Sequence, residues 1–310
     1  MRVVFLGTPE FAVPSLKALV CEHQIAAVFT QPDRPKGRGG RLTESPVKTA
    51  AFALGIPVHQ PERIRRPDSV ELLRNLAPEI MVVVGYGQII PQSIIDLPRR
   101  GILNVHASLL PKYRGAAPIQ WAIANGETET GVTIMQINAG LDTGDMLLKA
   151  ATAIGPAETA PQLSARLAPL GAGLLLEAIR NISAGTAHWQ KQDETKASIA
   201  PILKKEDGLI DWSRPAREIY DRLRGFTPWP GAYTSFRGQQ MSVVAALPLE
   251  HMPLNPAGLK TDKRRIFAGC GANTALELLE VQLAGKKAMS AEAFLNGYRP
   301  GEGEKLGDQT

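Results

Sequence analysis

Short apolar segments that alternate with helical segments constrain the fold of the first half of this chain more than any other feature. Arg2–Leu6, Ile25–Thr30 and Ile80–Val84 are nearly continuous apolar runs, as expected for strands buried on both faces of a sheet. Helices are expected between these runs, at 45–54 and at 69–76. This alternation predicts an α/β domain built on a doubly wound, mostly parallel sheet.

The turn after the first strand resembles a ligand-binding turn only in part. Thr8 is expected to cap a helix that begins at Pro9, because threonine is a good cap and proline suits the first helical turn. A dinucleotide fingerprint needs three glycines at fixed spacing, and only Gly7 is present. The sequence therefore supports a dinucleotide site weakly.

The second half of the chain has a different pattern. A long helix is expected over 159–184, interrupted at Pro169 and Gly171, and then an extended linker over 190–205. A helix at 214–223 precedes a series of short apolar runs that are separated by turns: 232–236, 241–246, 265–268 and 275–282. This rhythm predicts a small all-β module, with a barrel as its expected form.

Length and charge divide the chain in the same way. A chain of 310 residues is long for one core, and we expect domains over 1–188 and 207–310, joined by a linker over 189–206. The net charge is +5, yet residues from 206 onward carry 13 basic and 13 acidic side chains. The whole excess of positive charge therefore precedes residue 206, which excludes a C-terminal module that is basic overall.

The composition favours a cytoplasmic protein. No run of about 18 apolar residues is present, so no membrane span is expected. The segment Met1–Gly7 lacks the features of a signal peptide and fits a first strand. Cys21 and Cys270 lie far apart, without the spacing of a metal site or a disulfide framework.

A glycine-rich basic segment follows the second expected strand. Between Gln31 and Arg41, three glycines and one acid, Asp33, accompany four basic residues: Arg34, Lys36, Arg38 and Arg41. Such a segment can be a solvated, flexible loop. It can also be a mobile finger for phosphate groups, because clustered cations on adaptable backbone suit a nucleic acid.

The stretch 101–118 is the strongest candidate for a functional site. Asn104 and His106 are two residues apart on an expected strand, so their side chains leave the same face. Ligands of open α/β sheets bind beyond the carboxyl ends of the strands, where these residues lie. By themselves the two side chains could equally be loop caps, and Gly85 and Gly87 could serve a ligand or a tight turn.

Asp142 is the third residue that we single out. It lies in the turn-rich stretch Asn138–Asp145, where it could serve turn formation, bind a metal or pair with His106. Two acids without a His or Cys cluster make a metal site the weakest of these alternatives. Ser108 lacks the glycine-flanked turn of a nucleophilic serine, so a covalent mechanism is not favoured.

An amide, an imidazole and a carboxylate without a nucleophile fit direct acyl transfer between two bound substrates. Attack of an amine on a carbonyl builds an oxyanion, to which the Asn104 amide could donate. His106 could carry the protons that leave the amine, and a carboxylate could orient its ring. This chemistry requires all three side chains at one carbonyl carbon.

The sequence resembles the 10-formyltetrahydrofolate-dependent formyltransferases. The motifs that carry the resemblance are Asn104–Pro111, Tyr113–Pro118 and Gly140–Asp145. It extends from Met1 to about Leu295 through Gly7–Ser15, Gln31–Gly39, Lys205–Trp212 and Phe226–Ala232, which resemble the members that act on initiator tRNA. The resemblance implies a Rossmann-like formyl-transfer domain, a linker and an OB-like β-barrel.

The resemblance also implies substrates and site residues. The catalytic residues would be Asn104, His106 and Asp142, without a metal, and the formyl donor would be 10-formyltetrahydrofolate. The implied folate pocket comprises Ser108, Leu109, Leu110, Pro111, Tyr86, Gly87, Gln88 and Ile89. The acceptor would be methionine on initiator tRNA, contacted by Arg34, Lys36, Arg38 and Arg41 and by the C-terminal domain. We expect a monomer without an obligate protein partner.

Two other functions remain open from the sequence. The acceptor could be a small amine, such as a glycinamide nucleotide or an amino sugar, although the basic segment and the appended module exceed what a small acceptor requires. Alternatively, the chain could bind a nucleotide or RNA without catalysis, which predicts no folate binding.

Overall fold

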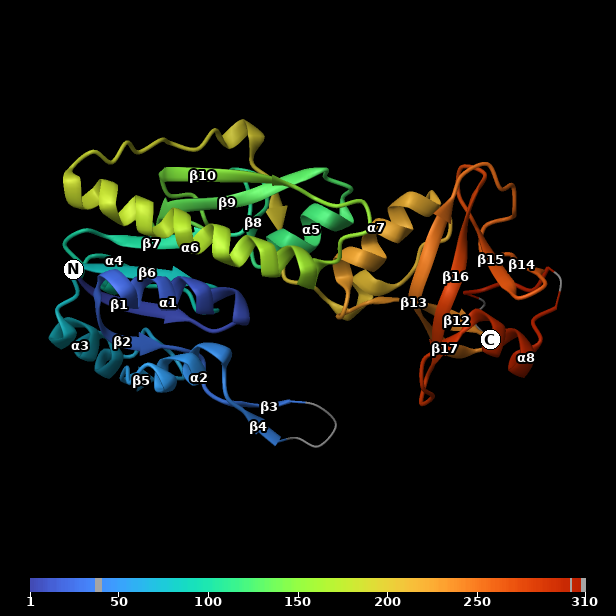
Figure 1. Ribbon diagram of the computed structural model, residues 1–310, viewed down its shortest axis with the longest axis horizontal. Helices are drawn as coiled ribbons and strands as arrows, with labels where there is room; N and C mark the ends of the chain where they lie inside the picture. Colours follow the sequence, from blue (N-terminus) through green and yellow to red (C-terminus); the bar gives the residue numbers. More distant parts are fainter. Residues whose placement is uncertain (37–40, 302, 308–310) are drawn as a thin grey trace. The chain divides into compact units, whose positions relative to one another are not determined.

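The computed structural model describes residues 1–36, 41–301 and 303–307, and the chain forms two compact units (Figure 1). Unit 1 comprises Met1–Pro118, Glu129–Ala153 and Leu163–Ile202. Unit 2 comprises Ile119–Thr128, Ile154–Gln162 and Leu203–Thr310. The polypeptide therefore passes between the units five times. The domain limits expected from the sequence, 1–188, 189–206 and 207–310, stay a prediction.

A seven-stranded sheet forms the centre of unit 1, in the order β10-β9-β7-β6-β1-β2-β5 (Figure 1). Its strands are β1 (Arg2–Gly7), β2 (Gln24–Phe29), β5 (Val58–His59), β6 (Ile80–Val84), β7 (Ile102–His106), β9 (Glu129–Gln136) and β10 (Met146–Ala153). The five strands from β5 to β7 are parallel, whereas β9 and β10 pair antiparallel at one edge. Since the chain winds outward from β1 in both directions, the expected doubly wound α/β fold is confirmed.

Helices cover the sheet because its strands are apolar on both faces. They are α1 (Val13–Glu22), α2 (Pro46–Ala53), α3 (Pro67–Leu76), α4 (Gln92–Ile95) and α6 (Ala160–Ala184). On one face, Leu73 of α3 and Ile94 of α4 join a core cluster with Met81 and Val83 of β6. Asn104 of β7 is the register partner of Val83 of β6. The side chain of Asn104 therefore lies on this face of the sheet.

Two helix predictions differ in detail from the structure. Helix α2 begins at Pro46, one residue after the expected start, and Ser45 caps it, since its hydroxyl accepts a hydrogen bond of 3.0 Å from the Lys48 amide. The expected cap by Thr8 is wrong, because its hydroxyl donates to the carbonyl oxygen of Tyr86 at 3.1 Å instead. A 3-10 turn, Glu10–Ala12, precedes α1 at this point. The Thr8 side chain therefore ties the turn after β1 to the turn after β6.

Helix α6 is continuous, so the expected interruption at Pro169 and Gly171 is wrong. Gly171 lies against the sheet so closely that a Cβ atom there would be 2.8 Å from Val105 and 3.4 Å from Val132. Packing of this helix on the sheet overrides the low helix propensity of proline and glycine.

The basic segment after β2 is paired at its two flanks. β3 (Arg34–Lys36) and β4 (Arg41–Thr43) form a two-stranded antiparallel ribbon, which was expected to be an irregular loop. Alternation of apolar and polar residues, which would have predicted these strands, is absent here. Arg38 lies outside the described residues.

The segment after α6 packs against the rest of unit 1. Gln190 exchanges two backbone hydrogen bonds of 2.8 Å with Met146, and a 3-10 turn, Glu194–Lys196, follows. Strand β11 (Ile199–Ala200) then pairs parallel with β8 (Arg114–Gly115). The chain expected as an extended linker is therefore held against the stretch that follows His106.

Unit 2 is built on an antiparallel sheet in the order β12-β13-β16-β15-β14, with β17 paired to β16. Its strands are β12 (Ala232–Phe236), β13 (Gln239–Leu249), β14 (Leu259–Asp262), β15 (Arg265–Cys270), β16 (Thr274–Leu283) and β17 (Met289–Ser290), and its helices include α7 (Ala216–Phe226) and α8 (Ala291–Tyr298). The expected small β domain is confirmed. Helix α8 was not expected from the sequence. Ser290 caps it, and Phe294 packs on Phe236 with ring centroids 5.1 Å apart.

No helix among 1–36, 41–301 and 303–307 is long and apolar enough to cross a membrane. Within the same residues, no group of three or more His, Cys, Asp and Glu side chains is placed to hold a metal ion.

Candidate active site

The carboxyl end of β7 presents two polar side chains on one face. Asn104 is half-buried and His106 is 5% exposed, while Val105 between them faces Gly171 of α6 on the other side. This alternation follows from the two-residue period of a strand. The expected common face of Asn104 and His106 is therefore confirmed.

A tight loop between β9 and β10 carries Asp142. The residue adopts a left-handed conformation with φ of 50°, and Gly144 lies where a Cβ atom would be 1.7 Å from the carbonyl oxygen of Gln136. Inside the loop, the Asn138 carboxamide oxygen accepts hydrogen bonds from the Gly140 amide at 3.0 Å and the Thr143 hydroxyl at 2.9 Å. The loop thus has one defined shape, which fixes the direction of the Asp142 side chain.

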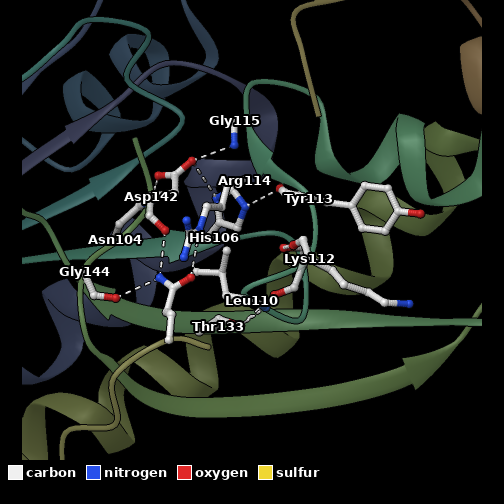
Figure 2. A network of polar contacts seen from close by, with 12 residues as sticks. Asn104, His106, Leu110, Lys112, Tyr113, Arg114, Gly115, Thr133, Asp142 and Gly144 are labelled. Carbon is white, nitrogen blue, oxygen red and sulfur yellow. Dashed lines mark hydrogen bonds and ion pairs between the residues drawn. The ribbon is translucent and has the colours of Figure 1, made fainter. Parts of the chain in front are cut away.

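The carboxylate of Asp142 lies among three nitrogen atoms (Figure 2). Its Oδ1 accepts a hydrogen bond of 3.4 Å from Asn104 Nδ2, and its Oδ2 accepts one of 2.8 Å from the Gly115 amide. The same Oδ2 is 3.6 Å from Nδ1 of His106. The structure therefore brings together all three side chains that the sequence singled out, and among the three roles considered for Asp142 the geometry favours the partner of His106.

The second nitrogen of the His106 ring is engaged by the backbone. Nε2 lies 2.9 Å from the carbonyl oxygen of Tyr113, a residue with φ of 61° (Figure 2). A carbonyl oxygen can only accept, so Nε2 carries a proton. The ring meets the Asp142 carboxylate through its Nδ1 edge alone. Sequence reasoning missed this role of Tyr113, because backbone conformation leaves no signal in side-chain chemistry.

The stretch after His106, in which folate contacts were expected, is held by buried and partly buried hydrogen bonds. The Ser108 hydroxyl donates to the carbonyl oxygen of Lys112 at 2.6 Å. Thr133 donates to the Ser108 carbonyl at 2.7 Å and accepts from the Leu110 amide at 3.1 Å. Lys149 Nζ donates to the Leu110 carbonyl at 2.6 Å, and burial lowers the pKa of this amine. The Ser108 hydroxyl thus stabilises the backbone of this loop, which agrees with the absence of a nucleophilic serine motif.

The side chains of the 108–111 segment divide by exposure. Leu110 is buried in a small cluster with Met135 and Met146, and Ser108 is fully buried. Leu109 and Pro111 are half-buried, so these two retain side-chain surface for a ligand.

The stretch after β6, the other part of the expected folate pocket, is also divided. Tyr86 is buried in the core between the sheet and its helices, and burial raises the pKa of its hydroxyl. Gln88 accepts a hydrogen bond of 2.7 Å from the Ile64 amide and donates one of 3.1 Å to the Pro61 carbonyl. By contrast, Gly87 is exposed and Ile89 is 90% exposed. An apolar side chain so open to solvent marks where a ligand could lie.

The single acid of the basic segment is already paired. Asp33 lies 2.5 Å from Nζ of Lys48 and accepts a hydrogen bond of 2.7 Å from Gln60. The hydrogen bond from Lys48 lowers the pKa of Asp33. Arg34 is exposed beside this pair. The carboxylate of Asp33 is therefore engaged by Lys48 and Gln60.

Comparison with known proteins places the chain in a family. The family model described as "Formyl transferase" matches residues 1–179, and "Formyl transferase, C-terminal domain" matches residues 202–299. The chain belongs to the formyl transferase family. It is 57% identical to the methionyl-tRNA formyltransferase of Solibacter usitatus, with 99% of each chain covered. Its identity to the methionyl-tRNA formyltransferase of Geobacter sulfurreducens is 47%, covering 99% of this chain and 97% of the relative.

Solved structures of the same fold are more distant in sequence. A sugar 3N-formyl transferase, crystallised in the presence of dTDP and 5-N-formyl-THF, matches with a TM-score of 0.68 and 18% identity over 93% of this chain and 99% of its own. An N-formyltransferase from Helicobacter canadensis, in complex with folinic acid and dTDP-3-aminofucose, matches with a TM-score of 0.66 and 19% identity over 90% of this chain and 98% of its own. These likenesses show the fold.

Proposed function

We propose that this protein transfers a formyl group from 10-formyltetrahydrofolate to the free amino group of methionyl initiator tRNA, giving N-formylmethionyl-tRNA for translation initiation. The relatives support this acceptor, because they are named methionyl-tRNA formyltransferase and cover nearly the whole chain at 47–57% identity. The observation that carries the chemistry is the convergence of Asn104, His106 and Asp142.

The surroundings of these three residues fit a folate formyl donor. When bound, 10-formyltetrahydrofolate supplies a formyl carbonyl that an amine can attack. Leu109, Pro111, Gly87 and Ile89 would hold it, since their surfaces are at least partly open. Tyr86, Gln88, Ser108 and Leu110 would shape the pocket from behind, because their side chains are buried or bonded within the protein. Two solved neighbours, one crystallised in the presence of 5-N-formyl-THF and one in complex with folinic acid, support a donor of this class.

Asn104 and His106 would stabilise the charge that develops on the formyl oxygen. An amide nitrogen carries two N–H groups, and the contact with Asp142 uses one of them. The other would donate to the oxyanion, as would a proton on Nδ1 of His106. Donors that are fixed before the reaction act without reorganisation, which is why such sites lower the barrier strongly.

Asp142 would hold the His106 ring in the orientation that this role needs. The carboxylate accepts from Asn104 and Gly115, which suits its ionised form, since an ionised carboxylate can only accept. With Nε2 committed to Tyr113, a second ring proton must lie on Nδ1, facing Asp142. The Nδ1 proton would pass to the departing nitrogen of the folate, and the proton that leaves the attacking amine would then replace it on Nδ1, directly or through a water molecule.

The basic segment would contact the tRNA. Arg34, Lys36, Arg38 and Arg41 belong to the part of the chain that holds the whole excess of positive charge. We propose that they neutralise phosphates near the acceptor end, together with a local face of the domain at 207–310. Binding that releases counterions in this way weakens steeply as salt is added.

A small amine acceptor is the main competing function, because one solved neighbour is a sugar 3N-formyl transferase and another is in complex with dTDP-3-aminofucose. These neighbours share only 18% and 19% identity, whereas the tRNA-specific relatives reach 57%. A protein that binds RNA without catalysis is the second competitor. It would not need the converging groups at the end of β7.

One experiment distinguishes the three functions. Formyl transfer from radiolabelled 10-formyltetrahydrofolate is measured in parallel to Met-charged initiator tRNA, Met-charged elongator tRNA and a dTDP-linked amino sugar. We expect rapid transfer to the initiator tRNA and little to the other two. Preference for the amino sugar would replace the proposed acceptor, and no transfer to any acceptor would refute the proposed activity.

A further inference from the structure

Gln192 holds the backbone on both sides of Thr143 in the Asp142 loop. Its Nε2 donates hydrogen bonds to the carbonyl oxygens of Asp142 at 2.7 Å and Gly144 at 2.8 Å. Both N–H groups of the carboxamide are therefore used on one loop. The left-handed backbone of Asp142 is unfavourable for a residue with a side chain, so the loop needs external contacts to keep this shape.

The orientation of the Gln192 carboxamide is fixed from its other side. Its Oε1 accepts a hydrogen bond of 3.0 Å from Nε of Arg114, which is 4% exposed. The Arg114 guanidinium also donates two hydrogen bonds, of 2.8 and 2.7 Å, to the carboxylate of Glu194. A reversed carboxamide would present N–H groups to a guanidinium, which has no acceptor, so only one orientation satisfies all partners.

Strand β8, which contains Arg114, also contacts Asp142 directly. Gly115 follows Arg114 in β8 and donates its amide to Oδ2 of Asp142. Gln192 thus fixes the backbone of the Asp142 loop, while Gly115 fixes the carboxylate, and Arg114 links the two. The segment at 190–196 therefore helps to fix the position of the Asp142 carboxylate, although it contains none of the three converging residues.

We propose that Gln192 is a positioning residue, which keeps the Asp142 carboxylate against Nδ1 of His106 through its hydrogen bonds to the Asp142 loop. It acts through the loop and does not touch the reacting atoms. Its effect on catalysis rests on the proposed formyl transfer. Its effect on the His106–Asp142 pair does not, and can be observed without any substrate.

The test uses two substitutions of matched size. Gln192→Met keeps the length of the side chain and removes every hydrogen bond. Gln192→Glu keeps an acceptor for Arg114 but has no N–H for the two carbonyl oxygens. Lys191→Met serves as the control, since it makes the same kind of change at the exposed neighbouring position.

The substrate-free readout is the imidazole nitrogen spectrum of His106 in protein labelled with 15N-histidine. The chain has five histidines, so the His106 signals are assigned by comparison with His106→Asn. In both Gln192 variants we expect these signals to move toward their positions in Asp142→Asn, while Lys191→Met leaves them unchanged. Single-turnover transfer should fall by about 10- to 100-fold with KM for tRNA within about threefold, because displacement of a catalytic group by 1 Å can cost this much.

The outcomes separate the proposals. Wild-type His106 signals in Gln192→Met would overturn the positioning role, whatever happens to activity. If Gln192→Met moves the His106 signals but Gln192→Glu leaves them at their wild-type positions, the contact with Arg114 explains the shift. That result would overturn the role of the Gln192 N–H groups. If the wild-type protein formylates no acceptor but the signals still move, the proposed function fails and the positioning role stands.

If Gln192→Met does not fold, a second variant tests the proposal. Glu194→Gln weakens only the support of Arg114 and should move the His106 signals in the same direction. Unchanged signals in that variant would overturn the proposal.

Discussion

The imidazole Nε2 of His106 and the carbonyl oxygen of Tyr113 lie 2.9 Å apart, and this contact decides which side of the ring can act. Because the carbonyl holds one proton on Nε2, any further proton on the ring must lie on Nδ1, 3.6 Å from Asp142. A protonated ring between these two partners is a hydrogen-bond donor on both sides. The Tyr113 carbonyl and the Asp142 carboxylate therefore both determine how the two ring nitrogens of His106 are oriented and bonded.

Replacing Asp142 with asparagine should remove the carboxylate that faces Nδ1 of His106. We expect single-turnover formyl transfer to fall by about 10²- to 10⁴-fold, the usual range for loss of a positioned acid or base. Asp145→Asn, in the same loop, is the matched control and should stay within a few-fold of the wild type. Equal rates for both variants would exclude the proposed role of Asp142.

Replacing Asn104 with alanine should remove one donor to the developing oxyanion. The expected loss in the rate of transfer is about 10²- to 10³-fold, with little change in tRNA affinity, because the donor is needed most in the transition state. Rapid-quench kinetics at saturating substrates measure the rate, and filter binding measures the affinity. A large loss of affinity with an unchanged rate would contradict the assignment.

The two cysteines should differ sharply in reactivity. Cys270 is 1% exposed, and burial raises the pKa of its thiol to about 12, whereas Cys21 is exposed. In the folded protein at pH 8, iodoacetamide should modify Cys21 alone, and both cysteines should react in denaturant. Peptide mass spectrometry identifies the site. Modification of Cys270 at the rate of Cys21 would contradict its burial.

The buried thiol also predicts a loss of stability in alkaline solution. The pKa of Cys270 is higher in the folded state than its ordinary value of 9.0, so only the unfolded chain releases this proton between about pH 9 and 12. The contribution to stability is complete below pH 9 and declines as the pH rises through this window. In Cys270→Ala the decline of the unfolding free energy, measured with urea, should be shallower than in the wild type. Identical slopes would contradict this prediction.

The ion pair of Glu194 with Arg114 should respond to acid. The hydrogen bond from Arg114 lowers the pKa of Glu194 below its ordinary value of 4.5. Its contribution to stability is therefore present above pH 4.5 and is lost as the pH falls through the lower folded-state value. The stability difference between wild type and Glu194→Gln should be greatest near neutral pH and shrink as the pH falls below 4.5. A difference that persists in acid would have another cause.

Two glycines of α6 form a matched pair for testing how the helix packs. Gly171→Ala would place a Cβ atom 2.8 Å from Val105 and should destabilise the protein by about 1–3 kcal/mol, as overpacking does. Gly173 is exposed with no atom within 4 Å of such a Cβ, so Gly173→Ala should stabilise the helix by about 0.5–1 kcal/mol. Urea unfolding measures both, and effects of the same sign would contradict the packing.

The features that the sequence predicts well are those set by local pattern. The apolar strands β1, β2 and β6 lie close to their expected limits, and α2 begins one residue after its expected start. Helix α6 was predicted poorly around Pro169, because packing on the sheet outweighs the propensity of a single residue.

The candidate site shows the same division. Asn104 and His106 could be paired from their spacing on one strand, and Asp142 could be suggested from its loop and from the family resemblance. Tyr113 and Gln192 could not be found, because one acts through its backbone and the other is a polar residue in an expected linker. Contacts between residues 50 positions apart depend on the path of the chain, which local patterns do not contain.

The five passages of the chain between the two units limit how these units can be exchanged or separated. Trp121 and Phe226 both belong to unit 2 and meet edge to face, with ring centroids 5.2 Å apart, although the sequence of unit 1 returns between them. A protein shortened at residue 202 would keep Trp121 and lose its aromatic partner. The units are interleaved in the sequence, so replacing unit 2 with another module requires that 119–128 and 154–162 be replaced together with the C-terminal part.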